Sequence, residues 1–199
     1  MYTLLLLLIY LAFISLGLPD SLLGSAWPVM HKAFQVPLSY AGLVTMIISG
    51  GTICSSLMSE RLTKKFGTQI VTVFSVMLTA IALFGFSTAS AFWMLCLWAV
   101  PYGLGAGAID AALNNYVALH YNSRHMSWRH CFWGLGTIIS PYVMSYALTT
   151  SVWQNGYRMV SFIQIGITLI LFVTLPIWKV NKKETTQEER AEEEMVGIK

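Results

Sequence analysis

Residues 92–118 read FWMLCLWAVPYGLGAGAIDAALNNYVA, a long apolar run whose one charged side chain is Asp110. A helix needs about 20 apolar residues to cross roughly 30 Å of hydrocarbon. As a helix, this run would form hydrogen bonds among its own backbone N–H and C=O groups, for which the lipid core offers no partner. The stretch therefore predicts a transmembrane helix that carries a carboxyl group inside the membrane.

The whole chain has the composition of a membrane protein. Of its 199 residues, 56% are hydrophobic and 11% are charged, whereas a soluble domain has about 25% charged residues. The net charge of +3 is too small to favour nucleic-acid binding. Cys54, Cys96 and Cys131 are odd in number and lie in apolar stretches, which indicates small buried side chains rather than a disulfide framework.

Six apolar segments follow one another along the chain. They cover residues 2–30, 38–58, 69–88, 92–118, 128–148 and 157–178. The first segment lacks the basic start of a signal peptide, so we expect it to be retained as a span. None shows the weaker alternation of a barrel strand. The sequence predicts an all-α membrane bundle over residues 1–178, followed by a charged tail or linker at 179–199.

Basic residues gather in alternate connections between these segments. One set comprises Arg61, Lys64, Lys65, Arg124, Arg129, Lys179, Lys182 and Lys183, and the other comprises Lys32 and Arg158. Cytoplasmic loops carry the excess of Lys and Arg. This pattern predicts a multi-pass protein of the cell membrane with both termini in the cytoplasm.

Two short motifs recur in order along the chain. GLPD at 17–20 in the first segment matches GAID at 107–110 in the fourth, and GTICS at 51–55 in the second matches GTIIS at 136–140 in the fifth. Transporters are often built from three-helix repeats of inverted topology. We therefore expect two inverted three-helix repeats, residues 1–90 and 91–178, with Asp20 and Asp110 as symmetry mates.

Asp20 and Asp110 are the candidate proton-coupling residues. An ionised side chain at the bilayer centre costs about 3 kcal/mol or more, so intramembrane acids usually face a cavity or a partner. No Lys or Arg is expected deep enough in the six segments to pair with them. Desolvation favours the protonated form, which would let each acid bind and release a proton. The structural alternative is an acid kept protonated by a hydrogen bond between helices.

Further polar and aromatic side chains are candidates for binding a solute together with the two acids. Asn114 lies one turn beyond Asp110 on the same helical face. The candidates are Asn114, Asn115 and Gln164 for hydroxyl groups, and Trp98, Tyr102, Phe132 and Trp133 for apolar sugar faces. Core packing is the alternative for every aromatic residue. A contact between helices is the alternative for Gly103 and Gly107.

The sequence offers no metal site, cofactor motif or catalytic constellation. The four histidines form no HExxH pattern or tight cluster, although His130 is a candidate for a proton path. The glycines of residues 103–107 lie inside a span rather than after a strand, which argues against a dinucleotide loop. We therefore expect neither an enzyme nor a bound cofactor.

These residues resemble the N-terminal half of a Major Facilitator Superfamily transporter, and within it the fucose permease-like group of sugar/proton symporters. The matching features are Asp20 in the first span, Asp110 followed by Asn114 in a Gly-rich fourth span, and a Gly-rich fifth span with Pro141. The family usually has Glu where this chain has Asp110. The resemblance implies that Asp20 and Asp110 couple protons and bind sugar.

A family motif in the loop after the second span is matched in part by ERLTKKFGTQ at residues 60–69. Leu62, Lys65 and Gly67 agree with it, whereas Glu60, Lys64 and Gln69 do not. The resemblance implies a gating loop that contains Glu60, Arg61, Lys65 and Gly67, with Glu60 in place of the usual acid.

The resemblance also implies a protein partner and a function for the chain. A second six-helix half, in cis, in trans or as a homodimer, would complete the cavity, and residues 179–199 resemble the linker between two halves. The expected function is proton-coupled uptake or exchange of a small polar solute by alternating access, with a sugar as the candidate solute. The alternative is a non-transporting assembly or receptor subunit whose acids serve helix association.

Overall fold

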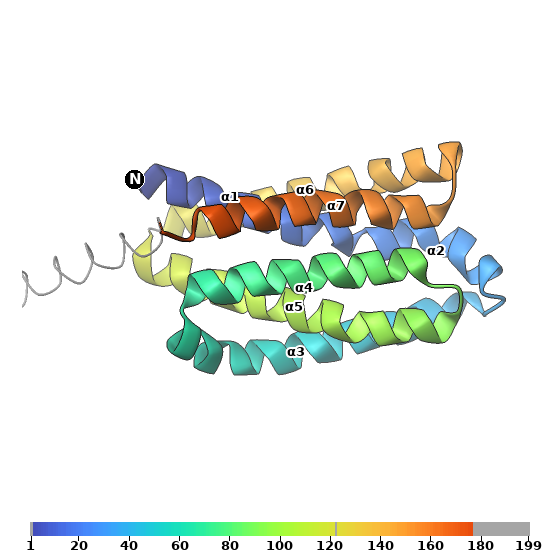
Figure 1. The fold of residues 1–199 in the computed structure, drawn as a ribbon, viewed down its shortest axis with the longest axis horizontal. Coiled ribbons are helices and arrows are strands. Elements are labelled where there is room, and N and C mark those ends of the chain that lie inside the picture. Colours follow the sequence, from blue (N-terminus) through green and yellow to red (C-terminus); the bar gives the residue numbers. More distant parts are fainter. Residues whose placement is uncertain (1, 122, 177–199) are drawn as a thin grey trace, which may run out of the picture.

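The computed structural model describes residues 2–121 and 123–176, and this part of the chain is helical (Figure 1). Its helices are α1 (Tyr2–Asp20), α2 (Leu22–Ala33), the 3-10 helix η1 (Leu38–Tyr40), α3 (Ala41–Phe66), α4 (Thr68–Thr88), α5 (Phe92–His120), α6 (Ser123–Thr150) and α7 (Trp153–Val173). Six helical segments are long and apolar enough to cross a membrane. The predicted all-α bundle with six spans is therefore confirmed. The predicted tail at 179–199 lies outside the described residues.

The first span differs from the single helix that the sequence predicts. It runs over Leu4–Ala33 but consists of α1 and α2, which meet at Ser21. Pro19 has no backbone N–H to donate to the preceding turn, so the regular hydrogen bonding of α1 ends here. Asp20 consequently lies at the last residue of α1 rather than within an unbroken helix.

The first span of each predicted repeat packs with the second and third spans of the other repeat. In Figure 1, α3, α4 and α5 lie together in the lower half of the view, and α1, α6 and α7 in the upper half. The helix α5 packs on α3 and α4, and α1 packs chiefly on α6. The exchange thus runs in both directions between the predicted repeats, although α1 contacts α7 much less than α5 contacts α4.

The recurring motifs meet each other at these two matched contacts. A Cβ atom added to Gly17 would lie 2.1 Å from the carbonyl oxygen of Trp133 on α6, and one added to Gly136 would lie 2.5 Å from that of Ile14 on α1. A Cβ atom at Gly107 would lie 2.3 Å from the carbonyl oxygen of Thr52 on α3. The glycines therefore allow backbone-to-backbone packing, the close approach that small residues permit between membrane helices.

The helices α3 and α6 leave large apolar faces uncovered. Met46, Ile53 and Leu57 on α3 are 72%, 62% and 78% exposed, and Tyr142 on α6 is 74% exposed. Apolar faces of this extent indicate contact with lipid or with another membrane segment. The inner faces of α1, α3, α5 and α6 surround the candidate site.

Candidate functional site

A cavity of about 440 Å³ opens between α1, α3, α5 and α6. Both intramembrane acids line it. The full lining comprises Phe13, Leu16, Asp20, Ile48, Thr52, Tyr102, Ala106, Asp110, His130 and Trp133. Its volume falls within the 300–1,000 Å³ of typical small-molecule sites. The fold thus places two carboxyl groups, an imidazole, a phenol and an indole around one space.

Asp20 is held by two hydrogen bonds from two other helices. The Tyr102 hydroxyl on α5 donates to Oδ1 at 3.1 Å, and the Trp133 indole Nε1 on α6 donates to Oδ2 at 2.9 Å. Tyr102 is buried and Trp133 is 37% exposed. The carboxylate of Asp20 therefore ties the end of α1 to α5 and α6 while it remains open to the cavity.

Asp110 is in a different environment in the middle of α5. It is half-buried. Its carboxylate accepts no hydrogen bond from residues 2–121 and 123–176. Two charges act on it across the site, an attraction from Arg129 and a repulsion from Asp20. Its side chain therefore lines the cavity without a hydrogen bond from the described residues.

Arg129 corrects the expectation that no cation lies deep enough to pair with the acids. It is 7% exposed on α6. Its Nε donates to the carbonyl oxygen of Met126 at 3.1 Å, its Nη2 lies 3.0 Å from His130 Nε2, and its guanidinium carbon lies 5.5 Å from the Phe13 ring centre. Its Nη1 is buried without a hydrogen-bond partner in the described part of the chain.

The sequence pattern groups Arg129 with the basic residues of the connection before the fifth span, so its burial is not predicted. In the structure α6 begins at Ser123, so Arg129 lies almost two turns inside the helix. The adjacent His130, singled out for a proton path, lines the cavity. An earlier helix start was the signal that could have placed Arg129 and His130, because a helix that begins at Ser123 contains both residues.

The predicted amide side chains lie outside this cavity. Gln164 is 1% exposed; its Nε2 donates to the Ser15 carbonyl oxygen at 2.7 Å, and its Oε1 accepts from Thr79 Oγ1 at 3.1 Å. These bonds join α7 to α1 and α4, so Gln164 has a structural role here. Asn115 is exposed on α5, and Asn114 is half-buried with an Oδ1 atom that has no partner among the described residues.

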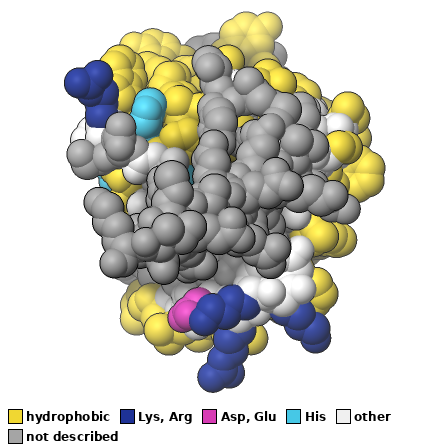
Figure 2. All heavy atoms as spheres, turned by 90° about the vertical axis from the view of Figure 1, so that its left-hand side faces the viewer, with side chains coloured by type: hydrophobic (Ala, Val, Ile, Leu, Met, Phe, Trp, Pro, Cys, Tyr) yellow, Lys and Arg dark blue, Asp and Glu magenta, His cyan; other side chains and the backbone are white. Residues whose placement is uncertain are grey.

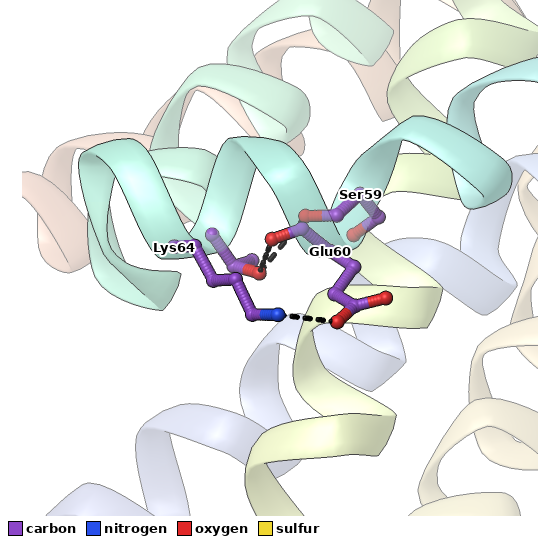
Figure 3. A network of polar contacts seen from close by, with 4 residues as sticks. Ser59, Glu60 and Lys64 are labelled. Atoms are coloured by element: carbon purple, nitrogen blue, oxygen red, sulfur yellow. Dashed lines mark hydrogen bonds and ion pairs between the residues drawn. The ribbon is translucent and has the colours of Figure 1, made fainter.

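The predicted gating residues lie at the end of the bundle where α3 turns into α4. Glu60 pairs with Lys64 one turn along α3, with 2.6 Å between Oε1 and Nζ, and both side chains are exposed (Figure 3). Gly67 ends α3 with a φ of +87°, which favours glycine. Arg61 and Lys65 are exposed nearby. Glu60 is therefore engaged within its own helix.

No metal centre accompanies the cavity in the described ranges. Across residues 2–121 and 123–176, no group of three His, Cys, Asp or Glu side chains is placed to hold a metal ion. The polar groups that line the cavity are instead hydrogen-bond donors and acceptors around two acids.

Comparisons with known proteins agree with this architecture. The family model of the Major Facilitator Superfamily matches residues 9–198. The chain is also 23% identical over 163 residues to the protein named "Bypass of stop codon protein 6" from Saccharomyces cerevisiae. The alignment covers 80% of this chain and 33% of that protein, so the chain spans about a third of the length of this relative.

Proposed function

The chain belongs to the Major Facilitator Superfamily, and we propose that it forms one wall of a proton-coupled carrier for a small polar solute. The superfamily consists of membrane transporters rather than enzymes, which agrees with the expected non-enzyme class. One observation carries the proposal: Asp20 on α1 and Asp110 on α5, which the sequence predicts to be symmetry mates, line the same cavity. A second six-helix half, in cis, in trans or as a homodimer, would supply the opposite wall.

Asp110 is the residue that we assign to proton exchange. With both carboxylates ionised and His130 neutral, Asp20, Asp110 and the buried Arg129 leave the site with one net negative charge. A proton on Asp110 brings that charge to zero. Because a charge is costly in a low-dielectric space, the protonated site reorients across the membrane more easily than the ionised site. Uptake of the solute would therefore follow the proton gradient.

The chemistry of the lining supports a neutral solute that is rich in hydroxyl groups. Trp133 offers an indole face to apolar C–H groups, while Asp110 and His130 offer acceptors and donors to hydroxyls. A sugar has both kinds of surface, and the resemblance to the fucose permease-like group favours the same class. Asn114, one turn from Asp110, completes the proposed set if the helices rearrange around the solute.

A second candidate function is an assembly or receptor subunit that does not transport. The two hydrogen bonds that Asp20 accepts favour it, because they join three helices as a structural acid would. Asp110 separates the two functions, since a carboxylate that accepts no hydrogen bond from the described residues contributes little to such an assembly.

Reconstitution tests the proposal directly. The chain and a second half are placed in vesicles with an imposed pH gradient, and uptake is measured over a panel of labelled monosaccharides and other small polar solutes. We expect uptake that Asp110→Asn abolishes while Asn115→Ala, on the exposed side of the same helix, leaves it intact. Gradient-driven uptake that persists in Asp110→Asn would refute the proton-coupling role, and no uptake of any solute would favour the assembly function.

A further inference from the structure

A second, apolar groove lies at the end of the bundle where α3 turns into α4. Its volume is about 330 Å³, and its walls come from Leu62 and Phe66 on α3 and from Ile70 and Phe74 on α4. Ala108 on α5 forms part of its floor. The groove is separate from the cavity of the two acids, with which it shares no lining residue.

Two exposed cations on α3, Arg61 and Lys65, each immediately precede a wall residue of this groove. Lys65 Nζ lies 5.3 Å from the centre of the Phe66 ring, and Phe66 is a wall residue. Arg61 lies one turn before Lys65, on the same face of α3. Lys and Arg side chains gather at the lower rim of this end of the molecule, beside one acidic patch (Figure 2).

The acidic residue at this rim does not neutralise Arg61 and Lys65 through direct contact. Glu60 pairs with Lys64 at 2.6 Å (Figure 3). Within the described ranges, Arg61 and Lys65 have no salt bridge, although both are exposed. Two positive charges therefore remain available at the boundary between an apolar groove and water.

We infer that this groove binds an anionic phospholipid, with an acyl chain along Leu62, Phe74 and Ala108 and the phosphate near Arg61 and Lys65. In a membrane-spanning bundle, an uncovered apolar groove is next to lipid, and cations at its water-side end attract anionic headgroups. Ile70 and Ser75, which both line the groove, are about 7.5 Å apart along the helix axis, so the site extends from the α3–α4 turn towards the membrane interior. This site stands independently of the proposed transport.

Competition between lipids tests the site. The full chain in detergent is offered equal amounts of phosphatidylglycerol and phosphatidylcholine with identical acyl chains, and bound lipid is counted by native mass spectrometry. We expect phosphatidylglycerol to be retained preferentially. Arg61→Gln and Lys65→Gln should each weaken its binding about fivefold relative to phosphatidylcholine. The control Arg124→Gln removes an exposed cation from α6 and should change nothing.

A second pair of variants tests the groove itself. Phe74→Ala removes a wall that is 71% exposed and should lower retention of both lipids, whereas Phe84→Ala, outside the groove on the same helix, should not. Circular dichroism verifies that each variant remains folded. Equal retention of the two lipids by the unsubstituted chain, or an unchanged preference after the loss of both cations, would overturn the inference. So would displacement of the lipid by an added second half.

Discussion

Asp20 and Asp110 occupy matched places in the two predicted repeats but have different surroundings. Each follows a glycine by three residues, and each glycine packs against the backbone of the partner repeat. Asp20 accepts hydrogen bonds from Tyr102 and Trp133, whereas Asp110 accepts none from the described residues. Gly17 and Gly107 thus have similar close backbone packing, while the polar groups around the two acids differ.

The position of each acid in its helix explains part of this difference. Asp20 ends α1 at the junction with α2, where its side chain reaches α5 and α6. Asp110 lies well inside the continuous helix α5 and faces the cavity. Its compensation is the charge of Arg129, which acts from α6 without a direct hydrogen bond. Asp20 is thus held by two hydrogen bonds, whereas Asp110 is held by none from the described residues.

The largest expected effect is on stability, and it tests whether the helix contacts at Gly17 and Gly107 are equally close. Gly17→Val and Gly107→Val should each destabilise the bundle by about 3 kcal/mol or more, because the new Cβ would lie within 2.1 Å and 2.3 Å of a carbonyl oxygen. The apparent midpoint of thermal unfolding measures the loss. Gly24→Val is the control, since a Cβ there meets nothing within 4 Å. If only one of the two substitutions destabilised the bundle, the two helix contacts would not be equivalent.

The second prediction concerns Arg129, the buried cation that attracts Asp110. Arg129→Gln should cost about 2 kcal/mol of stability at neutral pH, less than the 3–5 kcal/mol typical of fully buried pairs because Asp110 reaches the cavity. The loss should shrink in the Asp110→Asn background, because that substitution removes the charge that attracts Arg129. Thermal unfolding of the single and double variants measures both effects.

Two results would contradict this account of Arg129. An equal loss in Arg124→Gln, which removes an exposed cation from the start of the same helix, would show that the effect is not specific to the buried charge. A loss in Arg129→Gln that is the same with Asp110 and with Asn at position 110 would show that the two residues do not interact.

The smallest expected effect is on the Asp20 side. Tyr102→Phe removes one donor to the carboxylate and should cost about 1–2 kcal/mol of stability, with the pH dependence of uptake unchanged. The matched control is Tyr157→Phe, because the buried Tyr157 hydroxyl has no hydrogen-bond partner among the described residues. A shifted pH profile in Tyr102→Phe would assign proton exchange to Asp20 instead.

Much of the fold could be predicted because the membrane imposes few solutions. The lengths of the six segments determined the spans. The matches around Gly17, Gly51, Gly107 and Gly136 pointed to a repeat but not to the helix contacts that these glycines make. The break after Asp20 could not be placed, since Pro19 and Pro28 are both compatible with a continuous or a kinked span. Helix propensity alone does not distinguish a continuous first span from a kinked one.

The site could be predicted only in part because side-chain direction depends on packing. Asp20, Asp110 and Trp133 line the cavity, but Gln164 points into the α1–α4–α7 contact, where its amide bonds the Ser15 carbonyl oxygen and Thr79. Arg129 looked like a loop residue since a charge at the edge of an apolar segment is usually solvated. Its burial follows from the earlier start of α6 and from Phe13 on the facing helix.

Infrared difference spectroscopy during a pH jump tests most directly whether Asp110 is the acid that exchanges a proton in the cavity. The carboxylic C=O stretch of the reconstituted chain is compared in the unsubstituted protein, Asp20→Asn and Asp110→Asn. We predict a pH-dependent band that Asp110→Asn removes and Asp20→Asn retains. A band that survives in Asp110→Asn and is lost in Asp20→Asn would contradict the account.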